Sequence, residues 1–124
     1  MSVGSLMLNR VFKTKGFAST ATKALITDAD LCEAIREVMM GQADDLGGGV
    51  WKKRLNQNRH RSIILAKGRC YWVYQFLFAK QGLSNINKSE LATFRRLAKV
   101  YEGLSPAQIQ LLVDRQDFME ICNG

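Results

Sequence analysis

The sequence has no aspartate or glutamate between Leu46 and Ser89, a stretch of 44 residues. This acid-free stretch contains half of the chain's 18 Lys and Arg residues and its single histidine. The rest of the chain carries more acidic than basic residues, so the net charge of +7 comes from the acid-free stretch. A local excess of positive charge produces a focused positive potential, which most often meets a nucleic-acid backbone. The alternative is a solvated basic face with no such partner.

Proline occurs once, and no apolar run approaches the roughly 20 residues needed to cross a bilayer. With 124 residues, 47% of them hydrophobic, the chain is long and apolar enough to bury one core. This composition is not that of a disordered or membrane-spanning protein. It predicts a single domain over residues 1–124, located in the cytoplasm and without a membrane partner.

Cysteines are few: Cys32, Cys70 and Cys122 are odd in number and show no C-x-x-C spacing. This pattern argues against a disulfide framework and favours a reducing compartment, so we expect each cysteine to be buried in the core. A zinc site would require all three to converge with His60. The sequence therefore predicts no metal site and no cofactor.

The first acidic residue is Asp28, and the segment before it is basic and rich in Ser and Thr. Mitochondrial transit peptides have this composition, but the segment lacks an amphipathic arginine face. We therefore predict an irregular leader over residues 1–9, with Met7 as a second possible start of translation, and a short strand over Val11–Thr14.

Three helices are indicated by capping residues. Thr27 is expected to cap a helix that ends near Gly41, with Asp28 and Asp30 in its first turn. Asn87 and Glu90 resemble a capping box for a helix that runs to about Tyr101. Ser105, followed by proline at the first helical position, predicts a shorter helix.

Three strands are expected in the acid-free stretch: Val50–Leu55, Arg61–Ala66 and Cys70–Phe78. The third is apolar on both faces, which predicts a central strand whose aromatic residues belong to the core rather than stack on bases. Lys67-Gly68 predicts a hairpin turn, and Asp44 to Gly49 predicts a loop without the spacing of a phosphate-binding loop. The segment from Phe118 to Cys122 is an ambiguous short strand. The pattern predicts an α+β fold with a small antiparallel sheet.

The basic residues are expected to gather at one end of these strands. Alternation places Lys52 and Arg54 on one face, and an antiparallel partner would bring residues 59–61 beside them. Paired-carboxylate hydrolases, metal-dependent nucleases and Ser-His-Asp hydrolases need acids or ligands that this stretch lacks. RNA supplies its own nucleophile, the 2′-hydroxyl, so cations and one histidine are sufficient for its cleavage.

The candidate catalytic residues are Arg61, Lys80, Lys52, Arg54 and His60, and the further candidates for nucleic-acid contact are Lys53, Arg59, Lys67 and Arg69. Each has a simpler interpretation. Lys52 and Arg54 fit the solvated face of an edge strand equally well, and Lys53 fits a side chain that passes the core to reach solvent. His60 fits a loop residue without a role in proton transfer.

Several motifs, in order over about residues 10 to 104, resemble the RelE/ParE superfamily of bacterial type II toxins, and most of all its RelE/HigB-like members. The motifs are Val11-Phe12-Lys13-Thr14, Asp28-Ala29-Asp30-Leu31, Gly49-Val50-Trp51-Lys52-Lys53-Arg54, Arg61-Ser62-Ile63-Ile64, Phe78-Ala79-Lys80, Asn85-Ile86 and Leu97-Ala98-Lys99. The resemblance implies a sheet with N-terminal helices packed on it and C-terminal helices. In place of the family's longer Gly-Lys-Ser-Gly-Gly loop, this chain has Asn56-Gln57-Asn58-Arg59-His60.

The resemblance implies a toxin, neutralised by a cognate DNA-binding antitoxin that carries an acidic segment. RelE-like members cut mRNA on the ribosome without a metal ion, whereas ParE-like members inhibit DNA gyrase. The sequence therefore predicts a metal-independent, ribosome-associated mRNA endoribonuclease that inhibits translation, in which Arg61 and Lys80 stabilise the scissile phosphate. The alternatives are a non-catalytic inhibitor of gyrase or replication, and a nucleic-acid-binding module.

Overall fold

The structure is a computed structural model that describes residues 10–67, 71–80 and 86–122. The predicted leader over residues 1–9, the turn at Gly68, Arg69 and Cys70 lie outside these residues, as does the side chain of Lys67. The predictions for these positions are therefore not tested.

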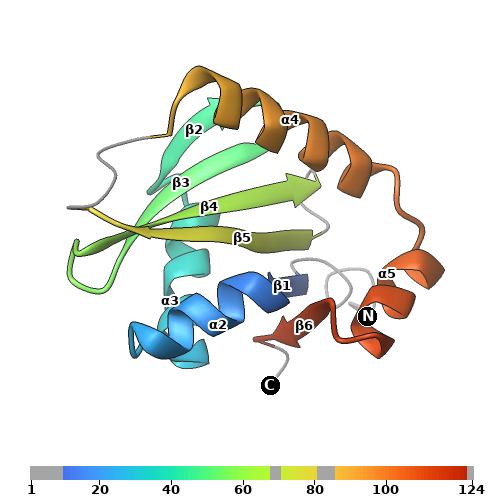
Figure 1. The fold of residues 1–124 in the computed structure, drawn as a ribbon, viewed down its shortest axis with the longest axis horizontal. Helices are drawn as coiled ribbons and strands as arrows, with labels where there is room; N and C mark the ends of the chain where they lie inside the picture. The colour runs from blue at the N-terminus through green and yellow to red at the C-terminus, as the bar shows by residue number, and fades with distance from the viewer. Residues whose placement is uncertain (1–9, 68–70, 81–85, 123–124) are drawn as a thin grey trace.

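A six-stranded sheet forms the middle of three layers (Figure 1). The elements are β1 (Arg10–Thr14), α2 (Lys15–Lys23), α3 (Asp28–Met39), β2 (Asp44–Gly47), β3 (Val50–Leu55), β4 (His60–Lys67), β5 (Tyr71–Ala79), α4 (Lys88–Glu102), α5 (Pro106–Asp114) and β6 (Phe118–Ile121). One face of the sheet packs against α2 and α3 in a core cluster that includes Phe17 and Leu31, and the other face packs against α4 and α5. The predicted α+β class is confirmed.

The strand order is β2-β3-β4-β5-β1-β6. Neighbouring strands are antiparallel except β1 and β5, which pair in parallel with Val11 opposite Trp72. β5 is an inner strand, as its two apolar faces predicted, and Trp72 and Tyr74 are buried. The ambiguous C-terminal segment forms β6, an edge strand on β1.

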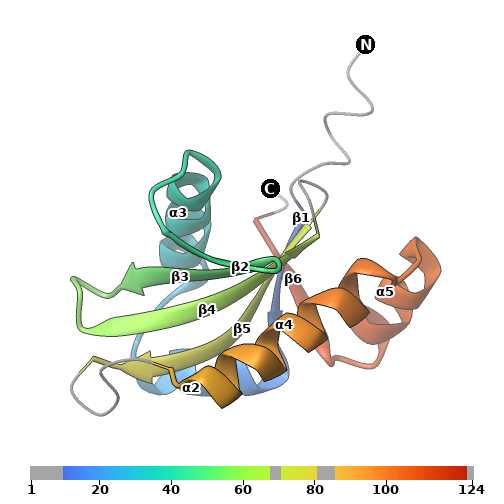
Figure 2. The same cartoon turned by 90° about the horizontal axis from the view of Figure 1, so that it is seen from above.

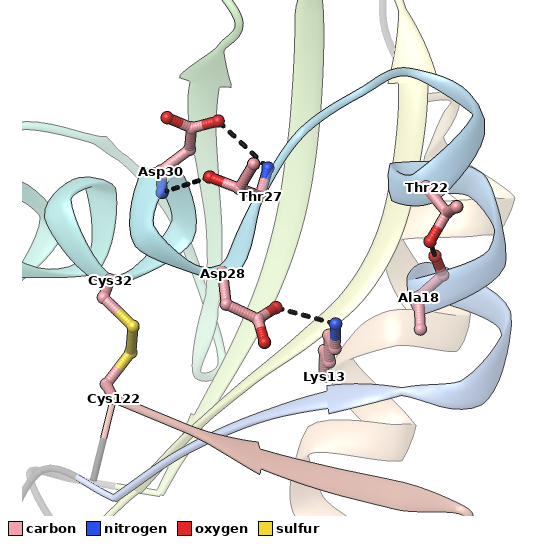
Figure 3. Close-up of polar contacts among 8 residues, drawn as sticks. All are labelled: Lys13, Ala18, Thr22, Thr27, Asp28, Asp30, Cys32 and Cys122. Carbon is pink, nitrogen blue, oxygen red and sulfur yellow. Dashed lines mark hydrogen bonds and ion pairs between the residues drawn. A yellow bond between two sulfur atoms is a disulfide. The ribbon is translucent and has the colours of Figure 1, made fainter. Parts of the chain in front are cut away.

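The predicted helix starts are confirmed by their caps. Thr27 accepts a hydrogen bond from the Asp30 backbone N–H, and the Asp30 side chain accepts one from the Thr27 N–H (Figure 3). The same reciprocal pair joins Asn87 and Glu90 at α4. Each cap satisfies two backbone donors that a helix otherwise leaves without partners.

The loop predicted over Asp44 to Gly49 is wrong, because Asp44–Gly47 forms β2. Asp44 pairs with Lys52 and Asp45 with Trp51 in an antiparallel register, and the chain reverses at Gly48 and Gly49, both of which have positive φ. Aspartates are depleted in strands, which hid β2 in the sequence. At a solvent-exposed edge, the low strand preference of aspartate matters less than the backbone hydrogen bonds with β3. As the edge strand, β2 covers backbone groups of β3 that would otherwise be exposed.

Two tyrosines are fixed by the core. Tyr74 is fully buried and its hydroxyl donates to the Leu31 carbonyl at 2.7 Å, so burial raises its pKa far above the ordinary value. Burial also raises the pKa of Tyr101 to about 12, and the Tyr101 hydroxyl donates to Gln75 Oε1 at 2.7 Å. Both hydroxyls therefore stay protonated and connect the sheet to helices on its two faces.

The expectation that the cysteines are separate buried residues is wrong for two of them. A disulfide joins Cys32 in α3 to Cys122, which follows β6 and is exposed (Figure 3). These positions are 90 residues apart in sequence. An ion pair between Lys13 and Asp28 at 2.7 Å also joins β1, the partner of β6, to the start of α3 (Figure 3). An odd cysteine count does not exclude one pair.

Candidate nucleic-acid interface at the β3–β4 turn

The candidate site lies where the β3–β4 hairpin reverses and β5 ends. Figures 1 and 2 both place this turn and the end of β5 at the left side of the molecule, away from β6 and α5. Leu55 pairs with His60 to close the turn, and the Lys80 N–H donates to the Arg59 carbonyl at 2.9 Å. This hydrogen bond fixes the end of β5 beside the turn.

The turn has an unusual backbone. Asn56, Gln57 and Asn58 have φ values of 55°, 54° and 69°, in the left-handed region that is costly for residues other than glycine. Asparagine tolerates this region better than most residues, but Gln57 has no such advantage. The Arg59 N–H donates to the Asn56 carbonyl at 3.1 Å and stabilises the turn. Strained backbone of this kind is frequent at functional sites.

A surface hollow of about 430 Å³ lies at the turn. Its lining residues are Gln57, Asn58, Arg59, His60, Ala79 and Lys80. Arg59 and Lys80 are exposed, and His60 is partly buried. The hollow therefore combines two cations, one imidazole and the side chains of a strained turn within reach of solvent.

Arg54 and Arg61 form a second cationic group beside the hollow. They are directly opposite each other in the β3–β4 register. Val50 and Ile63 pack against α4, and side chains two or four residues away along the same strand point to the same face, so Arg54 and Arg61 both lie on the α4 side of the sheet. His60 alternates to the α3 side. The Arg61 guanidinium nevertheless reaches the turn, where Nη1 donates to the Asn58 carbonyl at 3.1 Å and to the His60 carbonyl at 3.2 Å.

Lys52 and Lys53 are engaged in structural contacts. Lys53 Nζ lies 2.8 Å from a Glu37 carboxylate oxygen and donates to the Gln42 carbonyl at 2.9 Å, and its side chain is 12% exposed. This position is the one expected for a side chain that passes the core. Lys52 Nζ lies 3.8 Å from Asp44. In the part of the chain that the structure describes, no carboxylate forms an ion pair with Arg54, Arg59, Arg61 or Lys80.

The acid-free stretch of sequence is not free of acids in space. A second hollow, of about 450 Å³, lies between α3 and the turn, and its lining includes Asp30, Glu33 and Glu37 together with Arg54 and Asn56. The expectation of a basic cluster without a nearby carboxylate is therefore wrong on the α3 side. Helix α3 supplies acids from a distant part of the chain, which the sequence pattern of the hairpin does not indicate.

Of the other candidates, Lys67 ends β4, at the opposite end of that strand from the turn, and Arg69 lies outside the described residues. Sequence analysis missed Asn56 and Asn58, which build the turn. Two asparagines within three residues indicate left-handed backbone and could have identified the turn. They do not indicate that the Asn56 side chain contacts His60.

The site's groups fit binding and stabilisation of a phosphate. Cations next to a strained turn provide fixed positive charge where a phosphodiester gains negative charge on attack by a 2′-hydroxyl. Within the described ranges, no cluster of three or more His, Cys, Asp or Glu side chains is placed to hold a metal ion. Over the same residues, every helix is too short or too polar to span a bilayer.

Comparison with known protein families identifies the family of the chain. A family model described as the RelE toxin of the RelE/RelB toxin–antitoxin system matches residues 9–121. The chain belongs to the RelE toxin family. The match includes all the strands of the sheet and both cationic groups, so the RelE resemblance predicted from the sequence is confirmed. Comparison with curated proteins and with solved structures gave no significant match. As a RelE-family toxin, the protein is part of a toxin–antitoxin system.

Proposed function

We propose that this RelE-family toxin is a metal-independent mRNA endoribonuclease that acts on the ribosome and inhibits translation. The observation that carries the proposal is the hollow at the β3–β4 turn, where Arg59, His60 and Lys80 meet and Arg61 reaches the same turn. A ribosomal target implies that the protein acts in the cytoplasm.

In the proposed reaction, the RNA 2′-hydroxyl attacks the adjacent phosphate and loses its proton to water. The bond from phosphorus to the 5′-oxygen of the next nucleotide breaks, and this oxygen takes a proton from water, which leaves a 2′,3′-cyclic phosphate and a 5′-hydroxyl. Lys80 and Arg61 stabilise the negative charge that develops on the phosphate oxygens. Arg54 and Arg59 bind the flanking backbone, and a ring N–H of His60 donates a hydrogen bond to the reacting phosphodiester. Lys52 and Lys53 hold the hairpin against β2 and α3 through Asp44 and Glu37.

The antitoxin partner follows from the same charges. An acidic, partly disordered segment that folds on binding would neutralise Arg54 and Arg61 and extend over the surface of α4, where Val100 is 60% exposed. We propose that a neighbouring gene encodes such an antitoxin, which also binds DNA. Its affinity for the toxin decreases with salt but is not abolished, because apolar contacts persist.

The proposal is tested by inducing the protein in bacteria, mapping mRNA 5′ ends and measuring plasmid supercoiling in the same cells. We expect new 5′ ends inside coding regions, at positions set by the reading frame, and unchanged supercoiling. The matched control is the double variant R61A/K80A, which we expect to keep the fold and to produce no new ends. Altered supercoiling without new mRNA ends would instead indicate a gyrase inhibitor, and neither effect would leave only a binding function.

A further inference from the structure

Asn56 and His60 contact each other through their side chains across the β3–β4 turn. Asn56 Nδ2 lies 3.1 Å from His60 Nδ1, and the contact is partly buried. The two residues lie at opposite ends of the turn, and the left-handed backbone at Asn56 helps to place its side chain beside the imidazole. An amide nitrogen can only donate a hydrogen bond, so in this arrangement Nδ1 must accept it.

An imidazole nitrogen that accepts a hydrogen bond carries no hydrogen. The neutral ring must therefore carry its hydrogen on Nε2, the nitrogen that remains for other contacts. A hydrogen on Nδ1 as well, as in the imidazolium, would face the amide hydrogens of Asn56. In the neutral ring the contact therefore favours the tautomer with its hydrogen on Nε2.

We infer that Asn56 holds the imidazole of His60 in the tautomer that carries its hydrogen on Nε2, and that Nε2 donates a hydrogen bond to the scissile phosphate rather than transferring a proton to it. Asn56 is then a positioning residue. This inference rests on the proposed ribonuclease function for its catalytic part, whereas the tautomer is a property of the isolated protein.

The cations around His60 can stabilise the charge on the phosphate, so His60 needs to supply only a hydrogen bond. Arg59 and Lys80 line the hollow together with His60, and Arg61 donates to the carbonyls of Asn58 and His60. Beside these cations, a ring with its hydrogen on Nε2 supplies a directed N–H. Neutral imidazoles are known to act as donors to developing negative charge.

The tautomer is measured by nitrogen NMR of the imidazole at a pH at which the ring is neutral. His60 is the sole histidine, so its ring signals are unambiguous. We expect the hydrogen on Nε2 in the wild-type protein and on Nδ1 in Asn56→Asp, because a carboxylate accepts a hydrogen bond from Nδ1. The control is Asn58→Asp, which adds the same charge in the same turn and should leave the hydrogen on Nε2.

The role is measured by mRNA cleavage with His60→Gln and His60→Ala. A glutamine amide can donate from a similar position but cannot transfer a proton, so we expect it to retain activity to within about tenfold, while alanine loses about 10²-fold or more. A wild-type ring with its hydrogen on Nδ1, an Asn56→Asp variant with no change of tautomer, or a glutamine variant as inactive as alanine would overturn the inference. Absence of cleavage by the wild-type protein would contradict the proposed function, and the tautomer measurement would still decide the role of Asn56.

Discussion

Replacing Lys80 or Arg61 by alanine is expected to lower the rate of mRNA cleavage about 10²- to 10³-fold, because each variant loses one donor to the transition state. Both residues reach the turn, by different contacts. Lys80 lines the hollow beside Arg59 and His60, and Arg61 donates to the Asn58 carbonyl. The measurement is single-turnover cleavage of a defined mRNA on purified ribosomes.

The matched controls remove the same charge from the exposed face of α4. Lys99→Ala is the control for Lys80, and Arg96→Ala is the control for Arg61, since both α4 residues are exposed. We expect these controls to cleave within about threefold of the wild type, as surface substitutions away from a site usually have small effects. Equal losses in the controls would show that overall charge matters, and unchanged cleavage in both site variants would remove the site from the mechanism.

Reduction of the disulfide between Cys32 and Cys122 is expected to lower the free energy of unfolding by about 4–5 kcal/mol, the chain-entropy value for a loop of this length. The disulfide closes a loop with a sequence separation of 90 and ties the chain end after β6 to α3. The measurement is urea unfolding of the same protein with and without a thiol reductant. The reduced protein should unfold at a clearly lower urea concentration.

Two variants isolate the disulfide. Cys122→Ser should unfold at the same urea concentration with and without reductant, whereas Cys70→Ser should keep the difference. Identical curves for the wild-type protein under both conditions would show that the disulfide does not form.

The result also bears on the cellular state, because a reducing cytoplasm opens disulfides. There, β6 would depend on its pairing with β1 and on the ion pair between Arg10 and Glu120, at 2.9 Å, which also raises the pKa of Arg10.

Much of the fold followed from local signals. The capping residues Thr27, Asn87 and Ser105 predicted three helices, and the apolar pattern predicted β3. Apolar residues on both faces predicted the inner position of β5. Two features required tertiary contacts that no local pattern carries. The parallel pairing of β1 with β5 joins segments distant in sequence, and β2 is a strand because β3 offers it a partner.

The candidate site was predicted less completely than the fold. The register that brings Arg54 opposite Arg61 followed from antiparallel alternation, and Lys80 was expected beside the hairpin. Alternation alone did not predict that Arg61 folds back to the turn, nor that Asn56 contacts His60. These contacts depend on three left-handed residues, and the acids near Lys53 and Arg54 come from α3.

The central claim is that the toxin cleaves mRNA through the RNA's own 2′-hydroxyl, with the cations at the β3–β4 turn stabilising the phosphate. Its most direct test is a ribosome-bound mRNA with a single 2′-deoxynucleotide immediately before a mapped cleavage position. The account predicts that cleavage at this position is lost, while the unmodified mRNA is cut into fragments that end in a 2′,3′-cyclic phosphate and a 5′-hydroxyl. Cleavage of the modified mRNA at an unchanged rate, with 5′-phosphate products, would contradict it.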